Sequence, residues 1–360
     1  MINSFHIKNY RGFREFTIQP LERVNLVTGS NNVGKTALLE ALYLNLAPGM
    51  ALHTNLDSHS KAESSTWLNL FRGFKDVAFS LDNLSKWGWL FYGKDIRQDI
   101  ELISRRSPHH AQVVRLFWRV ENKNEGAPIP KGVSLEDLLV FLGVKFQNNG
   151  GEQFFWKILK SGGHQPPQNP RALDSAPLRL LFNSSSRPSE EVTKWFSTLA
   201  DLGRQDEIVE TLRLIDPRLK NLAVSTSDGP AMVYGDIGVG RRIPISQMGE
   251  GMVRLLTLVL EIANAAGGVV LVDEIENGLH YSVMGKVWTA IAGAARQSDT
   301  QIIATTHSFE CIRAAHAAFH GRDKYDLRLH RLDRIENEIR ATTYDEDTLS
   351  AAIESDFEVR

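Results

Sequence analysis

The sequence predicts an α/β protein with a mixed, largely parallel core sheet, and two groups of observations support this fold class. Residues 29–36, GSNNVGKT, fit the pattern G-x-x-x-x-G-K-[ST] and lie between an apolar strand at residues 24–28 and a helix at residues 37–46. Further along, residues 269–272 and 301–304 are two apolar segments without alternation. Such strands are typical of a parallel sheet covered by helices on both faces. Ligand groups should gather beyond the carboxyl ends of these strands.

Composition narrows the class of protein. The chain has 360 residues, of which 42% are hydrophobic and 23% charged, enough apolar surface for a sizeable core. A net charge of −2 limits any nucleic-acid contact to a local basic patch. The single cysteine, Cys311, excludes an intrachain disulfide and a zinc site built on cysteine pairs, and it fits a reducing compartment. No apolar run resembles a signal peptide or a membrane span, so we expect a cytoplasmic protein.

The first half of the chain is predicted to form strands around the helix that follows residues 29–36, the P-loop. Arg11-Gly12 separates two strands that form a hairpin, and the helix after the P-loop ends near Pro48-Gly49. Residues 50–110 read as irregular, and residues 161–177 as a loop rich in glycine and proline. The strands expected here are residues 2–7, 13–18, 112–120, 153–160 and 178–182, with a helical piece at residues 134–142.

The second half carries more helix. Ser189 is a candidate N-cap, because Glu190 and Glu191 follow it in the first turn. The expected helices are residues 189–202, 205–214, 252–265 and 282–295, one after Ser308, and one from Thr348. The expected strands, besides those at residues 269–272 and 301–304, are residues 222–225, 231–234, 327–332 and 338–343.

These elements indicate a single domain, residues 1–360, in two lobes. We expect an antiparallel β lobe and a helical subdomain beside the core sheet. The expected parts are a variable insert of loops and strands (50–185), a helical subdomain with a hairpin (186–245), the segment with the phosphate-site residues (246–316), and C-terminal strands with a helix (317–360).

Two features of the sequence allow both a purely structural interpretation and a functional one. For Trp87 and Trp89 we prefer packing in the core or the lobe to a base-stacking platform. The residues Arg105, Arg106, His109 and His110 favour a solvated loop, with a nucleic-acid contact as the alternative.

The residues of the P-loop suit a nucleotide phosphate. Its glycines allow positive φ and close backbone approach, so that successive N–H groups cradle phosphate oxygens at the positive end of the following helix. In this pattern Lys35 reaches the β- and γ-phosphates, and the Thr36 hydroxyl binds Mg²⁺.

Acids and a histidine follow the other two apolar strands. Asp273 takes the Walker B position, where its carboxylate holds the Mg²⁺ water shell, and Glu274 is placed to polarise the attacking water. Helix capping is the alternative for such acids, and we prefer it for Glu276. His307 follows residues 301–304 and is a candidate to donate a hydrogen bond to the γ-phosphate.

A third glycine-containing segment, ISQMGEGMVRLL at residues 245–256, begins an apolar helix. Glycines at a helix N-terminus form an anion site, although a plain helix cap is the alternative. Unless the chain folds back, this segment completes the site of a second subunit in a two-fold dimer around two ATP molecules.

This order of segments resembles the ABC-type ATPase heads of the SMC, RecF and OLD group. It is most similar to the standalone AAA-annotated ATPases of bacteria, several of which act in phage-defence or toxin–antitoxin-like modules. IKNYRGF, NLVTGSNNVGKTALLEALY, VVLVDEIENGLHYSVM and QIIATTHSFECI carry the likeness, which covers residues 1–46 and 243–316. It implies an ABC-type head that uses ATP and Mg²⁺. The nucleotide-binding residues so implied are Gly29, Asn31, Asn32, Val33, Gly34, Lys35, Thr36, Ala37, Gly249 and Gly251.

The resemblance also assigns roles and departures. It implies Glu274, His307 and Lys35 as catalytic residues and Thr36 and Asp273 as metal ligands. Placed by Arg254, the serine of the common Ser-x-Gly signature is Gly249, and Ser246 serves only with a shifted register. Long coiled coils, a Cys-x-x-Cys hook and room for a TOPRIM nuclease after His307 are missing from the sequence.

The expected function is therefore an ATPase that forms a homodimer across ATP and acts as a switch for a separate effector, a nuclease or toxin, in phage defence. Arg11 is a further candidate for nucleotide contact. Two alternatives stay open: a RecF-like DNA-binding repair ATPase, and a weakly hydrolysing, ATP-bound regulator that sequesters a toxin or nuclease.

Overall fold

The computed structural model describes most of the chain outside one long and several short gaps. The described residues are 1–46, 88–120, 128–129, 140–148, 153–159, 164–165, 178–181, 189–226, 229–322, 324–355 and 359. The expectations for Trp87 and for the loop at residues 161–177 lie largely or wholly outside these ranges. None of the described helices is long and apolar enough to span a membrane.

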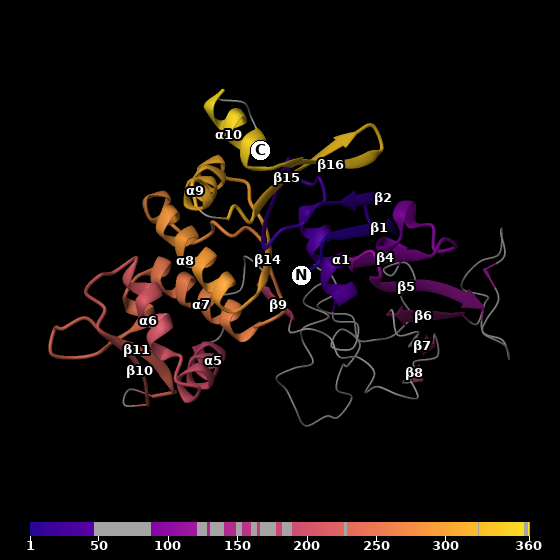
Figure 1. The fold of residues 1–360 in the computed structure, drawn as a ribbon. Coiled ribbons are helices and arrows are strands. Elements are labelled where there is room, and N and C mark those ends of the chain that lie inside the picture. The colour runs from indigo at the N-terminus through magenta and orange to yellow at the C-terminus, as the bar shows by residue number, and fades with distance from the viewer. Residues whose placement is uncertain are drawn as a thin grey trace.

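A six-stranded sheet forms the centre of the molecule, in the order β16-β15-β3-β14-β13-β9 (Figure 1). The strands β3, β9, β13, β14 and β15 run parallel, and β16 pairs antiparallel at one edge. Their bounds are Val24–Gly29, Leu178–Leu181, Val269–Val272, Gln301–Thr305, Leu327–Ile335 and Glu338–Tyr344 for β3, β9, β13, β14, β15 and β16. All residues of β3, β13 and β14 are buried, as apolar runs without alternation require. The predicted α/β fold with a mixed core sheet is confirmed.

Helices cover both faces of this sheet. The helix α1 (Lys35–Leu46) packs on one face with Val27, Leu271 and Ile303. On the other face lie α7 (Glu250–Asn264), α8 (Met284–Gln297) and α9 (Phe309–Phe319). The terminal helix α10 (Glu346–Glu354) packs against α9.

A second, seven-stranded antiparallel sheet covers the outer side of α1, in the order β2-β1-β4-β5-β6-β7-β8. Because α1 lies between two sheets, nearly all of its side chains are buried, and its sequence is apolar on every side. The bounds of the strands are Ser4–Tyr10, Phe13–Ile18, Ile100–Ser107, His110–Val120, Val140–Gln147, Gln153–Leu159 and His164–Gln165 for β1, β2, β4, β5, β6, β7 and β8.

A small helical subdomain packs on α7, on the side of the molecule opposite the antiparallel sheet (Figure 1). It contains α5 (Ser189–Asp201), α6 (Gln205–Arg213) and a three-stranded sheet, β10-β11-β12. These strands span Asn221–Ser225, Met232–Asp236 and Ile243–Pro244. The predicted antiparallel lobe and helical subdomain are both present.

Several local predictions are wrong. Residues 100–107, which we expected to be irregular, form β4, because their alternating side chains pack against β1 and β5. The helix expected at residues 134–142 gives way to β6 from Val140 onward, since β6 pairs with β5 and β7. Trp89 is 61% exposed, with Lys94 over its ring, so packing in the core does not explain it. Ser189, a candidate N-cap from the sequence, is instead the first residue of α5.

Candidate functional site

The P-loop connects β3 to α1 at the carboxyl end of the core sheet. Gly29 has φ of 135°, and a Cβ at this position would overlap the carbonyl oxygen of Leu332 on β15. Gly34 has φ of 112°, and its Cβ would lie 3.0 Å from the Phe13 ring. The two glycines are therefore required by backbone conformation and by space. Between them Asn31 and Asn32 are exposed, while Val33 is buried in the core and Ala37 is half-buried.

The Lys35 side chain folds over this loop. Its Nζ donates hydrogen bonds to the carbonyl oxygens of Gly29, at 2.6 Å, and Ser30, at 2.9 Å. Burial lowers the pKa of Lys35, and three carboxylates oppose that shift, those of Asp273, Glu274 and Glu276. The tertiary structure thus brings the acids that follow β13 into the electrostatic field of the P-loop.

Thr36 and Asp273 meet directly. The Thr36 hydroxyl donates to both carboxylate oxygens of Asp273, at 3.3 and 3.2 Å. Asp273 is 1% exposed, and its Oδ1 also accepts a hydrogen bond of 2.7 Å from the hydroxyl of Thr305. Strands β3, β13 and β14 each supply or position one member of this group, because their carboxyl ends lie at one edge of the sheet.

Glu274 lies beside this group with an unusual backbone. Its φ is 49°, in the left-handed region, and its N–H donates to the Thr305 hydroxyl at 2.8 Å. The Asn277 side-chain amide donates to Glu274 Oε2 at 2.8 Å, and His307 Nε2 lies 3.8 Å from Glu274 Oε1. The carboxylate is only partly buried, so a small molecule can reach it. An exposed carboxylate held by an amide and next to an imidazole is suited to accept a proton.

Glu276 does not cap a helix, because the short helix that follows it, Tyr281–Val283, has His280 as its N-cap. Its Oε1 instead accepts a 2.7 Å hydrogen bond from the backbone N–H of His307. This bond fixes the turn between β14 and α9, and the cap of α9 is Ser308, which accepts from the N–H of Cys311. The preferred interpretation of Glu276 from the sequence is therefore wrong, and its role is to hold the backbone of the histidine.

Arg11 is engaged elsewhere than at the P-loop. Its guanidinium forms a 3.0 Å ion pair with Glu40, which is 1% exposed on α1. Arg11 therefore ties the β1–β2 turn to α1, and the structure gives no support for a nucleotide contact.

The signature segment lies apart from the P-loop. Gly249 caps α7 with φ of 103°, Gly251 lies in its first turn, and Ser246 is in the short helix Ile245–Gln247. In the described ranges, none of these three residues shares a hydrogen bond or an ion pair with residues 29–36. The start of α7 instead packs against Gly278, where an added Cβ would lie 3.0 Å from the Glu250 carboxylate.

Two oxygen ligands of the kind that Mg²⁺ prefers are adjacent at this edge. The Thr36 hydroxyl touches the Asp273 carboxylate, so both fit a small divalent cation in a shell completed by water and phosphate oxygens. Over the described part of the chain no group of three or more histidine, cysteine or acidic side chains is arranged so that it could hold a metal ion. Thr36 and Asp273 therefore supply only part of the ligands that a metal ion would need.

Sequence reasoning missed two members of the site. Thr305 bridges Asp273 and Glu274, and Asn277 holds the Glu274 carboxylate. The available signal was positional: Thr305 ends an apolar strand two residues before His307, and Asn277 follows Glu274 by three.

Two family models match the chain. Residues 1–84 match a family described as "AAA ATPase domain". Residues 148–312 match one described as "AAA domain, putative AbiEii toxin, Type IV TA system". The two matches contain the P-loop and the Asp273–His307 group, respectively.

Two curated relatives match the chain over very different lengths. The chain is 24% identical over 337 residues to an ATP/GTP phosphatase of Helicobacter pylori, covering 87% of this chain and 86% of the relative. It is 42% identical over 43 residues to the DNA replication and repair protein RecF of Idiomarina loihiensis, covering 12% of each.

Solved structures of SMC heads are similar in outline. A head domain bound to the C-winged helix domain of ScpA matches with a TM-score of 0.49 and 13% identity, covering 98% of this chain and 99% of that one. The head domain from Thermotoga maritima matches with a TM-score of 0.44 and 12% identity, covering 96% of this chain and 99% of that one. The fold class rests on the strand order and registers described above.

Proposed function

We propose that this chain, which is an AAA-type ATPase of the SMC- and RecF-like kind, hydrolyses ATP with Mg²⁺ at the edge where the P-loop meets Asp273, Glu274 and His307. One observation carries the proposal most directly. The hydrogen bonds from Thr36 to Asp273, from Thr305 to Asp273, and from Glu274 to Thr305 hold the P-loop and the acids in one rigid group. Rigid placement of this kind is what phosphoryl transfer requires.

The residues divide the work by position. Backbone N–H groups of residues 29–36 and the start of α1 bind the phosphates, and Lys35 exchanges its loop carbonyls for phosphate oxygens. Thr36 and Asp273 hold Mg²⁺, which when bound neutralises charge on the phosphate oxygens.

Glu274 is the residue that we assign to the water. Its carboxylate is partly exposed, is held on one side by Asn277, and faces His307 on the other. It accepts the proton of a water molecule aligned with the terminal phosphate. The His307 ring, whose backbone Glu276 fixes, donates to the γ-phosphate and reports its presence.

A second copy of the chain would complete the site. Gly249 and Gly251 form the exposed N-terminal end of α7 and share no hydrogen bond with the P-loop among the described residues. Such a helix end binds anions, so in a two-fold dimer it would meet the γ-phosphate held by the partner's P-loop. ATP would then close the dimer, and hydrolysis would open it.

The closure of the dimer is our candidate for a switch that acts on a separate effector. The name of the family that matches residues 148–312 includes a toxin–antitoxin system, which favours a role in phage defence with a toxin or nuclease as effector. A RecF-like role would instead require hydrolysis stimulated by DNA with a steep salt dependence. A weakly hydrolysing regulator would show negligible turnover.

Glu274→Gln tests this proposal. The change keeps the shape and the Asn277 contact but removes the base, so kcat should fall by about 100-fold or more while ATP binding is retained. With Mg²⁺-ATP the variant should accumulate as a dimer in size-exclusion chromatography with light scattering. Glu338→Gln, at an exposed acid that pairs with Arg340 on β16, is the matched control and should behave as wild type. Wild-type turnover by Glu274→Gln would overturn the assignment of the base.

A further inference from the structure

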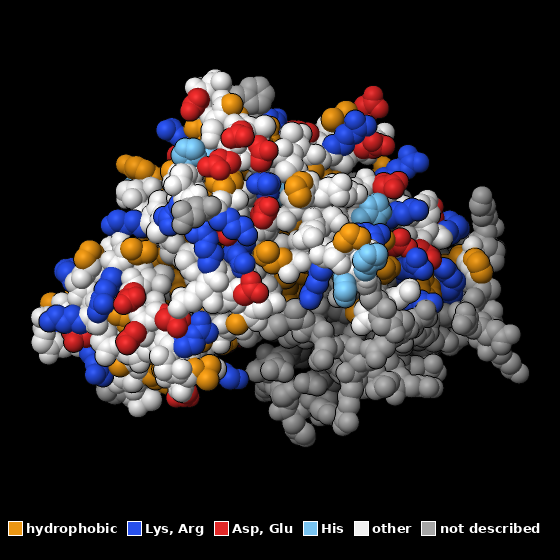
Figure 2. Space-filling view, viewed as in Figure 1, with side chains coloured by type: hydrophobic (Ala, Val, Ile, Leu, Met, Phe, Trp, Pro, Cys, Tyr) orange, Lys and Arg blue, Asp and Glu red, His pale blue; other side chains and the backbone are white. Residues whose placement is uncertain are grey.

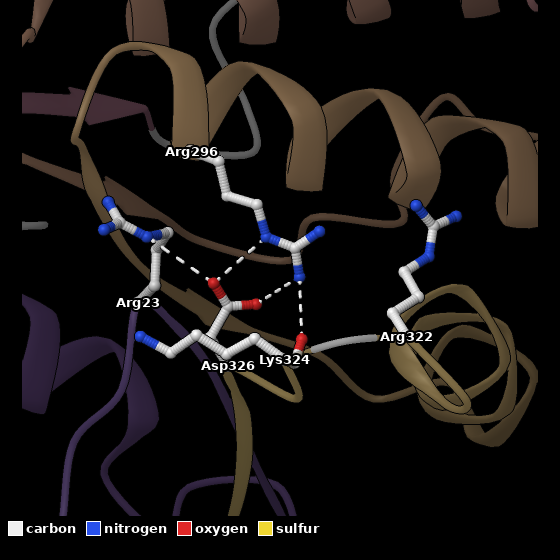
Figure 3. Close-up of a pocket in the computed structure, with 5 residues that line it drawn as sticks. All are labelled: Arg23, Arg296, Arg322, Lys324 and Asp326. Atoms are coloured by element: carbon white, nitrogen blue, oxygen red, sulfur yellow. Dashed lines mark hydrogen bonds and ion pairs between the residues drawn. The ribbon is translucent and has the colours of Figure 1, made fainter.

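A second concentration of charge lies at the opposite edge of the core sheet. A pocket of about 500 Å³ is lined there by Arg23, Arg296, Arg322, Lys324 and Asp326 (Figure 3). Arg23 directly precedes β3 and Asp326 directly precedes β15, so the pocket lies at the amino ends of strands whose carboxyl ends carry the P-loop and its neighbours. It is therefore separate from the candidate ATP site.

Asp326 organises two of the arginines. Its side chain is 2% exposed, and Arg296 binds it in a fork, with Nη2 at 2.5 Å from Oδ1 and Nε at 3.1 Å from Oδ2. Arg23 Nε lies 3.5 Å from Oδ2 on the other side. The hydrogen bond to Asp326 raises the pKa of Arg296 above its usual range.

Further contacts fix both guanidinium groups. Arg23 Nη1 donates to Asp299 at 2.9 Å and to the carbonyl oxygen of Ala295 at 3.3 Å. Arg296 Nη2 also donates to the carbonyl oxygen of Lys324 at 3.1 Å. These contacts leave Arg23 Nη2 and Arg296 Nη1 without a bond to any described residue. Two rigid planar groups with spare donors are thus ready for a ligand, which lowers the entropy cost of binding.

Arg322 and Lys324 add charged side chains that pair with no described residue. Both are exposed, and within the described residues neither side chain forms a hydrogen bond or an ion pair. Four cations line the pocket together with one carboxylate, Asp326, and a second carboxylate, Asp299, pairs with Arg23. Figure 2 shows Lys and Arg side chains gathered near the centre of the face that is turned toward the viewer.

A role in holding the fold together explains only some of the charged residues that line the pocket. Arg296 lies in the last turn of α8, where a cation is favoured by the helix dipole, and its pairing with Asp326 ties α8 to β15. Arg322 and Lys324 lie beyond α9, which ends at Phe319, and they contribute no such tie. Their side chains, unpaired among the described residues, are what points to a ligand.

We propose that this pocket binds a small ligand through a diphosphate or oligophosphate group. Guanidinium groups bind phosphate oxygens in pairs, and the lysine adds a point charge. The unpaired cations and the spare guanidinium donors suit an anion, and the volume falls within the roughly 300–1,000 Å³ of small-molecule sites. The cations line one hollow and come from residues 23, 296 and 322–324, whereas a nucleic-acid backbone calls for a stripe of charge.

Pyrophosphate is the probe, measured by isothermal titration calorimetry. Because the P-loop would bind it too, the titration uses full-length protein with Lys35→Ala, and in parallel wild-type protein saturated with a non-hydrolysable ATP analogue. Each should bind one pyrophosphate. Adding Arg322→Ala and Lys324→Ala should weaken this binding by tenfold or more, while the same pair of changes alone should leave the affinity for ATP unchanged.

The matched control is Lys194→Ala with Arg313→Ala, which removes the same charges from exposed positions on α5 and α9 outside the pocket. This control should weaken pyrophosphate binding by less than twofold. Equal weakening by both double variants would overturn the proposal, as would no binding in either preparation. Binding of duplex DNA but not of pyrophosphate, lost on Arg322→Ala and Lys324→Ala, would replace it with a nucleic-acid contact.

Discussion

Thr305→Val is the sharpest probe of how the site is held together. The Thr305 side chain is fully buried at the end of β14, where its hydroxyl donates to Asp273 at 2.7 Å and accepts from the N–H of Glu274 at 2.8 Å. Valine keeps the branched shape and removes both hydrogen bonds. We expect a loss of stability together with a loss of turnover, because one hydroxyl holds both Asp273, the proposed metal ligand, and Glu274, the residue that we propose acts on the water.

The magnitude follows from the two bonds. A hydrogen bond to a carboxylate contributes about 1.5–3 kcal/mol, and a neutral one about 0.5–1.5 kcal/mol. The free energy of unfolding should therefore fall by about 2–4 kcal/mol. Glu274 has a left-handed backbone that its N–H bond helps to hold, so the carboxylate should shift. Because small misplacements near the reacting atoms are costly, kcat should fall about tenfold or more.

Urea unfolding and steady-state ATP hydrolysis measure the two effects. Thr300→Val is the matched control, since that buried hydroxyl donates to the carbonyl oxygens of Ile262, Ala265 and Ser298, far from the site. It should cost about 1 kcal/mol and leave kcat unchanged. Thr305→Ser should restore most of the activity. If Thr305→Val unfolds within about 0.5 kcal/mol of wild type and hydrolyses ATP normally, the hydroxyl does not hold the site.

Two other outcomes are expected. Gly29→Ala should abolish binding of a fluorescent ATP analogue, because the new Cβ overlaps a β15 carbonyl oxygen at φ of 135°; Gly267→Ala, with φ of 72° but open space around it, should bind normally. Burial lowers the pKa of His330 to about 3, below its unfolded value near 6.5, so the unfolded chain binds more protons between these values and stability falls as the pH drops. His330→Phe should remove roughly 2 kcal/mol of the loss in unfolding free energy between pH 7 and 5, whereas the exposed-residue change His109→Gln should leave that loss as it is.

Local patterns located most of the elements. The P-loop strand and helix, the strands β13 and β14 and the helices α5 to α8 fall within a few residues of the positions predicted from apolar runs and helical spacing. The failures lie where pairing partners decide the outcome. The strand β4 has ordinary polar and charged residues at its exposed positions, and only the antiparallel sheet around it makes it a strand.

By itself, the sequence determined which candidate residues lie together, because the P-loop, Asp273, Glu274 and His307 each follow an apolar strand and must share one edge of a parallel sheet. Only the tertiary structure decided which side chains hold these residues in place. Thr305, Asn277 and Glu276 act through hydrogen bonds between segments about 30 residues apart or across a tight turn, and no spacing rule encodes such contacts. The cationic pocket has the same origin, since its residues come from three separate places in the chain and meet only at the far edge of the sheet.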